Sequence, residues 1–177
     1  GPVEVVNDDR RGFAWWNVDQ AAKDRALKAQ RARDLSTWRP INLEAVRLAV
    51  SEFVDEIDRP SPNRPIIIGG FSQGAILALD VALTSTREFA GVFFASGSAI
   101  LAPEWDRQLL LKRKLNVVMT HGQHDIDLSF AGAEALRDRL LRAGHNVRWR
   151  PFEGGHEMPV MAWRELKAMI REATQKD

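Results

Sequence analysis

The chain has 177 residues, of which 28% are charged, and its formal net charge is +1 at pH 7. This balance gives no overall field that would attract nucleic acid or an anionic membrane. The absence of cysteine excludes disulfides, thiolate metal ligands and a cysteine nucleophile. The length predicts a single domain over residues 1–177. No run approaches the ~18 apolar residues of a membrane span, so we expect none and take the cytoplasm as the default location.

The first third of the chain predicts one short strand and two helices. Residues 3–6 are rich in valine and form the sole early strand candidate. Asp19 is suited to cap a helix that we expect to continue to about Leu35. A second helix is expected from about Asn42 to Asp58, with an apolar stripe that faces the core. That stripe consists of Leu43, Val46, Val50, Phe53, Val54 and Ile57.

The remainder of the chain alternates between strand patterns and helix patterns. Short apolar runs rich in β-branched or aromatic residues predict strands at residues 64–69, 91–95, 116–121 and 146–152. Helical patterns occupy residues 75–83, 129–143 and 160–174. This alternation predicts an α/β fold, with a mostly parallel sheet and helices on both of its faces.

The segment Gly70-Phe71-Ser72-Gln73-Gly74 lies between a predicted strand and a predicted helix. A G-x-S-x-G sequence in this context is typical of a nucleophile elbow, a sharp turn that exposes the serine hydroxyl. The flanking glycines are expected to let the strand and the helix approach each other. Ser72 is therefore the candidate nucleophile.

A serine nucleophile needs an imidazole as base and a carboxylate that orients the imidazole. Asp125 follows the predicted strand that ends at His121, and His156 follows the strand that ends at Phe152. The carboxyl ends of parallel strands meet at one edge of a sheet, which is where open α/β sheets bind ligands. The order Ser72, Asp125, His156 is also the chain order of α/β-hydrolase triads.

Other residues compete for these roles. Asp127 is two positions from Asp125 and is the alternative carboxylate, while His121, His124 and His145 are the alternative bases. His121, His124 and Asp125 also offer donors for a metal, but they fall in a predicted loop rather than on one helix face. We expect neither a metal nor a cofactor.

The motifs resemble those of the phospholipase/carboxylesterase family of α/β-hydrolases, which includes acyl-protein thioesterases and small bacterial carboxylesterases. The matching segments are Gly69 to Ala75, His121-Gly122 with Asp125, Gly155-His156-Glu157 and, more loosely, Phe13-Ala14-Trp15-Trp16-Asn17. The resemblance implies an α/β-hydrolase fold and assigns the catalytic aspartate to Asp125 and the catalytic histidine to His156.

The chain departs from the family at its beginning. Family members have an earlier strand, which ends in a His-Gly loop that supplies one oxyanion donor. The backbone N–H of Gln73 can supply the other donor. We therefore expect an N-terminally truncated fold whose nucleophile strand has an exposed edge, covered by a complementing chain or a second copy. Gly1-Pro2 is also consistent with a protease-cleavage scar.

Tryptophans are the best candidates for contacts with a substrate. Trp16 lies in the family-like element, and Trp105 lies in residues 98–114, which are expected to emerge on the catalytic side and cover the site. Core packing is the competing interpretation for both, as it is for Trp15, Trp149 and Trp163. The basic helix at residues 23–33 is interpreted as a solvated face, because Asp24 and Asp34 dilute its charge. No nucleic-acid partner is expected.

Together these features predict a serine hydrolase that cleaves small-molecule esters or thioesters through an acyl-enzyme, without a cofactor. Acyl transfer to an alcohol or amine would use the same residues. The alternative from another class is a non-catalytic binding module or fragment, because its oxyanion hole would be incomplete.

Overall fold

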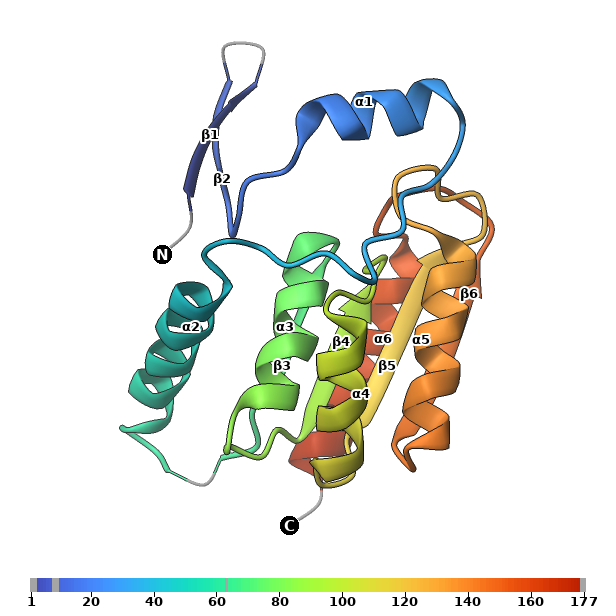
Figure 1. Ribbon diagram of the computed structural model, residues 1–177. Coiled ribbons are helices and arrows are strands. Elements are labelled where there is room, and N and C mark those ends of the chain that lie inside the picture. The colour runs from blue at the N-terminus through green and yellow to red at the C-terminus, as the bar shows by residue number, and fades with distance from the viewer. Residues whose placement is uncertain (1–2, 8–9, 63, 176–177) are drawn as a thin grey trace.

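The computed structural model describes residues 3–7, 10–62 and 64–175. Its main sheet has four parallel strands in the order β3-β4-β5-β6 (Figure 1). The strands are β3 (Ile67–Phe71), β4 (Gly91–Ala95), β5 (Asn116–Gly122) and β6 (Asn146–Phe152). The predicted parallel sheet is confirmed.

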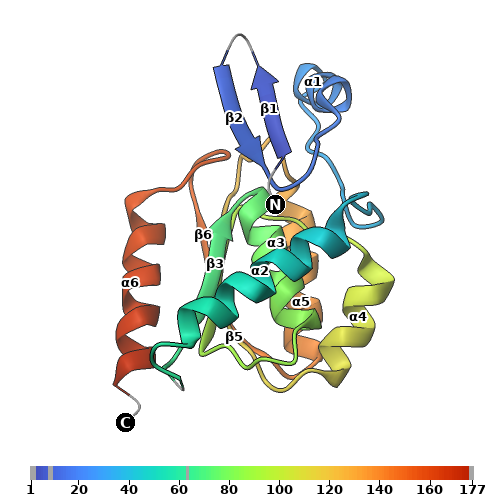
Figure 2. The same ribbon diagram turned by 90° about the vertical axis from the view of Figure 1, so that its left-hand side faces the viewer.

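The described residues form six helices beside the sheet. They are α1 (Gln20–Lys28), α2 (Leu43–Asp58), α3 (Gln73–Thr84), α4 (Ala102–Leu111), α5 (Phe130–Arg142) and α6 (Val160–Thr174). Helix α6 lies against one face of the sheet, while α2, α3, α4 and α5 lie on the side of the other face (Figure 2). The predicted arrangement, with helices on both faces, is therefore confirmed.

The two faces of the sheet contribute to two hydrophobic clusters. Because side chains alternate along a strand, Val92 and Phe94 of β4 join the larger cluster under α3, and Phe93 and Ala95 join the smaller one under α6. All five residues of β4 are buried, as expected for a parallel strand covered on both sides. Helix α3 is buried at nine consecutive positions, residues 75–83, so it is a core helix.

The N-terminal strand lies apart from the main sheet. β1 (Val3–Asn7) pairs with β2 (Arg10–Ala14) as an antiparallel hairpin, which projects beyond the sheet (Figures 1 and 2). Among the described residues, β3 therefore has a neighbouring strand on one side only. Beside its open edge, an apolar groove is lined by Ile67, Phe71, Trp163 and Ile170, among others. The complementing chain or second copy expected at this edge remains a prediction.

Two helix predictions need correction. Helix α1 ends at Lys28, not near Leu35, because Gln30 adopts a left-handed conformation with φ 51°. The chain after it is not helical before α2, and Arg33 forms an isolated parallel bridge with Leu128. In α2, Phe53 and Ile57 are 61% and 45% exposed, so they do not belong to the buried stripe.

The segment at residues 98–114 does not cover the site as expected. Most of it forms α4, which packs beside α3 on the helical layer (Figure 1). Trp105 is fully buried, and its indole N–H donates to Asp80 at 2.9 Å. Trp105 is therefore a core residue, and its predicted contact with substrate is wrong.

Candidate active site

Ser72 lies at the turn between β3 and α3. Its backbone has φ 54° and ψ −119°, a conformation that costs a non-glycine residue about 1–3 kcal/mol and is therefore typical of functional turns. Its N–H donates to the Ala95 carbonyl at 2.8 Å, which fixes the turn to the neighbouring strand. A side chain at Gly70 would overlap the backbone of Gly74, so Gly70 allows the close approach. Gly74 itself has room for a side chain, contrary to expectation.

The loops that carry Asp125 and His156 are packed tightly against each other. The N–H groups of Gln123 and His124 donate to the carbonyls of Phe152 and Gly154, both at 2.9 Å. A Cβ at Gly122 would overlap the Gly155 carbonyl, so only glycine permits this contact. The two loops consequently form one rim at the carboxyl end of the sheet.

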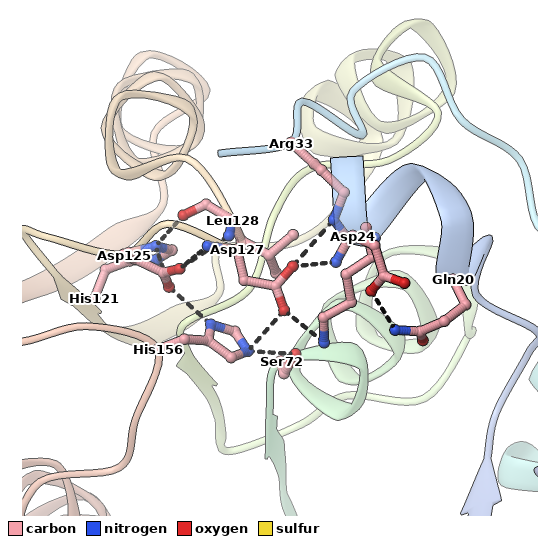
Figure 3. A network of polar contacts seen from close by, with 10 residues as sticks. Gln20, Asp24, Arg33, Ser72, His121, Asp125, Asp127, Leu128 and His156 are labelled. Carbon is pink, nitrogen blue, oxygen red and sulfur yellow. Dashed lines mark hydrogen bonds and ion pairs between the residues drawn. The ribbon is translucent and has the colours of Figure 1, made fainter. Parts of the chain in front are cut away.

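This rim and the elbow bring the three candidate residues together. Ser72 Oγ is 2.9 Å from His156 Nε2, and His156 Nδ1 is 2.8 Å from Asp125 Oδ2 (Figure 3). When His156 Nδ1–H donates to Asp125, Nε2 is left to accept the Ser72 proton. The chain of contacts therefore has the geometry in which an imidazole can act as base for a hydroxyl.

The environment of Asp125 favours its charged form. Its side chain is fully buried, and burial alone would raise its pKa. Hydrogen bonds from His121, His156 and the Leu128 N–H outweigh burial, so the pKa of Asp125 lies well below its usual range. Asp125 is thus held as a carboxylate, the form that can orient and stabilise an imidazolium.

His121 supports this carboxylate from the other side. Its Nε2 is 3.2 Å from Asp125 Oδ2 and 3.1 Å from the Leu128 carbonyl oxygen, whereas its buried Nδ1 has no hydrogen-bond partner. A proton on Nε2 satisfies both oxygens, which indicates that tautomer. His121 therefore contacts Asp125 on the side away from His156, and among the described residues no hydrogen bond joins it directly to Ser72.

The other alternative residues lie elsewhere. Asp127 Oδ2 is 3.9 Å from His156 Nε2, beyond hydrogen-bond distance. His124 is exposed and contacts Glu153, and so it does not join His121 and Asp125 in a metal site. His145 lies buried before β6, at the opposite end of that strand from the Ser72 rim, where its Nδ1 accepts from the Leu115 N–H at 3.1 Å.

A cavity of about 320 Å³ opens beside Ser72. Its apolar lining includes Trp16, Leu35, Trp38, Ile76 and Leu128, and its polar lining includes Lys23, Arg33 and Asp127. Trp16 is 2% exposed and packs edge-on against Trp38 with 5.9 Å between the ring centroids. The volume is within the range of small-molecule sites.

Gln73 connects the elbow to this wall. Its side-chain oxygen accepts from the Trp15 N–H at 2.7 Å, and its side-chain nitrogen donates to the Trp16 carbonyl at 2.9 Å. Its own backbone N–H lies in the first turn of α3, where helical N–H groups have no intrahelical acceptor. Gln73 thus positions Trp16 and offers a donor beside Ser72.

The sequence interpretation missed the part of the wall formed by residues 18–38, which we call the arm. Val18, Lys23, Arg33, Leu35 and Trp38 all line the cavity, although the basic stretch was interpreted as a solvated face. The signal of Lys23 and Arg33 was weak because such residues are common on ordinary surfaces and their partner Asp127 is about a hundred positions away. Only the apolar Leu35 and Trp38 after the basic stretch hinted at burial.

The fold and the elbow define the class: the chain is an α/β-hydrolase-type protein with a serine at the strand–helix turn. It belongs to the Phospholipase/Carboxylesterase family, whose profile matches residues 3–174. Among solved structures, Arabidopsis thaliana SOBER1 aligns with a TM-score of 0.72 at 19% identity, covering 94% of this chain and 76% of that one. Esterase PE8 aligns with a TM-score of 0.73 at 24% identity, covering 92% and 71%.

Two fungal relatives resemble the chain in sequence, and both are acyl-protein thioesterase 1. The Neurospora crassa protein is 33% identical over 106 residues, a match that covers 57% of this chain but only 43% of that protein. The Gibberella zeae protein is 25% identical over 174 residues, covering 94% of this chain and 70% of that protein. Among the described residues of this chain, no helix has the length and apolarity needed to cross a bilayer.

Proposed function

We propose that the chain is a serine hydrolase that cleaves carboxylic esters or thioesters. The observation that carries the proposal is the continuous contact from Ser72 Oγ to His156 Nε2 and from His156 Nδ1 to Asp125 Oδ2, at 2.9 and 2.8 Å. The family and the fungal thioesterases support the same class of reaction.

In this proposal Ser72 attacks the carbonyl carbon while His156 accepts the hydroxyl proton. The buried carboxylate of Asp125 stabilises the imidazolium that forms. The tetrahedral oxyanion receives a hydrogen bond from the Gln73 N–H at the N-terminus of α3, where the helix dipole adds to its stabilisation. His156 then protonates the departing alcohol or thiol, and water releases the acyl group by the same steps in reverse.

The cavity beside Ser72 is the proposed acyl pocket. Trp16, Trp38 and Ile76 offer apolar surface to a hydrocarbon chain, and the opening lies next to the nucleophile. Trp16 thereby keeps the substrate-contacting role predicted for it. The proposed substrate is a small molecule with an apolar acyl group, and the chain's own residues supply the chemistry without a cofactor.

The test is turnover of p-nitrophenyl esters by the wild type and by Ser72→Ala. The substitution should lower kcat/KM by on the order of 10⁴-fold or more, because the nucleophile and its base act as a unit. Ser61→Ala, a serine outside the cavity, is the matched control and should retain wild-type turnover. Equal rates in Ser72→Ala and the wild type would reject the proposal.

A fluorophosphonate reagent gives an independent result, because it reacts only with an activated serine. We expect labelling of the wild type and of Ser61→Ala, and none of Ser72→Ala. A wild-type protein that folds but is not labelled would favour the non-catalytic binding module instead.

A further inference from the structure

The loop after β5 contacts His156 through Asp125 and the arm through Asp127. At its start, Asp125 contacts His156, and the N–H groups of Asp127 and Leu128 donate to Asp125 Oδ1 at 2.8 and 2.9 Å. The carboxylate of Asp127 lies between Arg33 and His156 (Figure 3), because its Oδ1 accepts from Arg33 Nε at 3.0 Å and its Oδ2 is 3.9 Å from His156 Nε2. One short loop therefore supports the proposed catalytic carboxylate and also reaches the arm.

Asp127 binds two cations of the arm. Its Oδ2 is 3.0 Å from Lys23 Nζ, and its Oδ1 accepts from Arg33 Nε at 3.0 Å and also from Arg33 Nη2. The carboxylate is only 8% exposed. Burial alone would raise the pKa of Asp127, but the hydrogen bonds from Lys23 and Arg33 outweigh it and lower the pKa. A buried carboxylate of this kind depends on its partners.

The arm depends on Asp127 in turn. Helix α1 has no buried residue, so hydrophobic packing holds it only weakly. Beyond the two ion pairs, the Arg33 N–H donates to the Asp127 carbonyl at 2.9 Å. Asp127 thus holds the arm by its side chain and its backbone, at the place where the arm walls the cavity beside Ser72.

We propose that Asp127 is a specificity-determining positioning residue, which clamps the arm through Lys23 and Arg33 and so sets the width of the acyl pocket. The inference rests on the proposed esterase function, since it assigns the cavity to the acyl chain. Without the carboxylate, two cations remain close together and repel each other, and the arm moves outward. Long acyl chains, which need the closed wall, then bind less well than short ones.

The decisive variant is Asp127→Asn, which removes the charge but keeps the size and the backbone contacts. We expect KM for a p-nitrophenyl ester of a long acyl chain to rise about tenfold, the effect of losing one charge-assisted contact. KM for the acetate ester should rise less than KM for the long ester, and any change in kcat that follows from the loss of a charge 3.9 Å from His156 Nε2 should be the same for both esters. Asp24→Asn is the matched control, because Asp24 lies on α1 next to Lys23 and, among the described residues, contacts only Gln20, by an exposed hydrogen bond.

Limited trypsin digestion reads the position of the arm without relying on activity. Arg25, Lys28 and Arg31 lie on the arm outside the clamp. Cleavage after these residues should be faster in Asp127→Asn than in the wild type or Asp24→Asn. Lys23→Met, a change at a more exposed position, should give a smaller effect in the same direction, which keeps the test open if Asp127→Asn does not fold.

Three results would overturn the inference. The first is unchanged KM for the long ester, and the second is unchanged tryptic cleavage, in both Asp127→Asn and Lys23→Met. The third is a loss of fluorophosphonate labelling in Asp127→Asn that matches its loss of ester turnover, since Asp127 would then act on Ser72 and not on the pocket wall. A wild type that resists labelling would reject the esterase function instead, while the tryptic comparison would still decide whether the clamp exists.

Discussion

The scaffold under Ser72 and the arm above it are held together by different forces. Helix α3 is buried at nine consecutive positions and packs on β3 and β4, so the elbow rests on hydrophobic burial. Helix α1 has no buried residue and is held by ion pairs to Asp127 and by backbone hydrogen bonds, whereas Leu35 and Trp38 at the end of the arm pack against the core. Ser72 is thus fixed by many weak contacts, whereas the part of the pocket wall that includes α1 depends on a few contacts that single substitutions can remove.

The largest expected effect comes from breaking the polar contact inside the scaffold. Asp80 is fully buried in α3 and is bound by Arg47 Nε at 2.6 Å, by Arg47 Nη2 at 2.7 Å and by the Trp105 indole. Arg47→Met leaves this carboxylate without its cation. The free energy of unfolding, measured by urea denaturation, should fall by about 3–5 kcal/mol.

Asp80→Asn in the same background provides the control. Asn keeps an acceptor for Trp105 and removes the unpaired charge, so the double variant should recover much of the lost stability. If the double variant is as unstable as Arg47→Met alone, the unpaired charge is not the cause. Trypsin cleavage in the arm should not change selectively in any of these variants.

The next effect concerns Gln73, whose side chain connects α3 to Trp15 and Trp16 in the pocket wall. Gln73→Met removes the acceptor for the Trp15 N–H and the donor to the Trp16 carbonyl. Leaving such groups unpaired should lower the free energy of unfolding by about 1–3 kcal/mol and raise KM for long esters. Gln108→Met, on α4, should stay within about 0.5 kcal/mol of wild type. A Gln73→Met protein with wild-type stability and wild-type KM would show that these two hydrogen bonds do not hold the pocket wall.

The smallest effect depends on pH and lies at the far end of the scaffold. Burial lowers the pKa of His145, whose Nδ1 accepts from the Leu115 N–H. The unfolded chain therefore binds a proton at higher pH than the folded protein does. The neutral, buried His145 therefore contributes to the free energy of unfolding in full above about pH 6.5, the ordinary pKa of histidine. This contribution is lost as the pH falls toward the lowered pKa of the folded protein. The loss should be on the order of 1 kcal/mol for each unit by which the pKa is lowered.

The measurement is the free energy of unfolding, determined by urea denaturation at several values between about pH 8 and about pH 5, on either side of the ordinary pKa of histidine. Its change with pH is the slope to compare. His145→Asn keeps an acceptor in the side chain but cannot be protonated, so its slope should be flatter than that of the wild type. His124→Asn, at an exposed position, should keep the pH dependence of the wild type. Equal slopes in all three proteins would contradict the assignment of His145.

The sequence predicted the scaffold better than the wall, and the reason is physical. Short apolar runs and the turn at Ser72 are local signals, so the strands and the elbow were recognised from neighbouring residues. The positions of Asp125 and His156 followed because parallel strands end at one edge. The preference for Asp125 over Asp127 agrees with the geometry, in which Asp125 is the hydrogen-bond partner of His156.

The arm could not be predicted in this way because its contacts are distant in sequence. Arg33 and Asp127 are 94 positions apart, and no local pattern pairs them. The predicted contact between Trp105 and substrate was wrong for a related reason. It depended on the direction in which residues 98–114 leave the sheet, which no local pattern determines. In the structure the Trp105 indole N–H donates to the buried carboxylate of Asp80, and the sequence alone does not indicate this partner.

The missing side chain at Gly122 has a consequence for how the protein loses its proposed activity. Since the two rim loops are in close contact at that point, a bulkier residue there is expected to push His156 and Asp125 apart. By the same logic, we expect heat or denaturant that detaches one of these loops to disturb the other as well, because two backbone hydrogen bonds join them. We therefore expect the proposed activity to be lost when this contact opens, although the contact involves none of Ser72, Asp125 and His156.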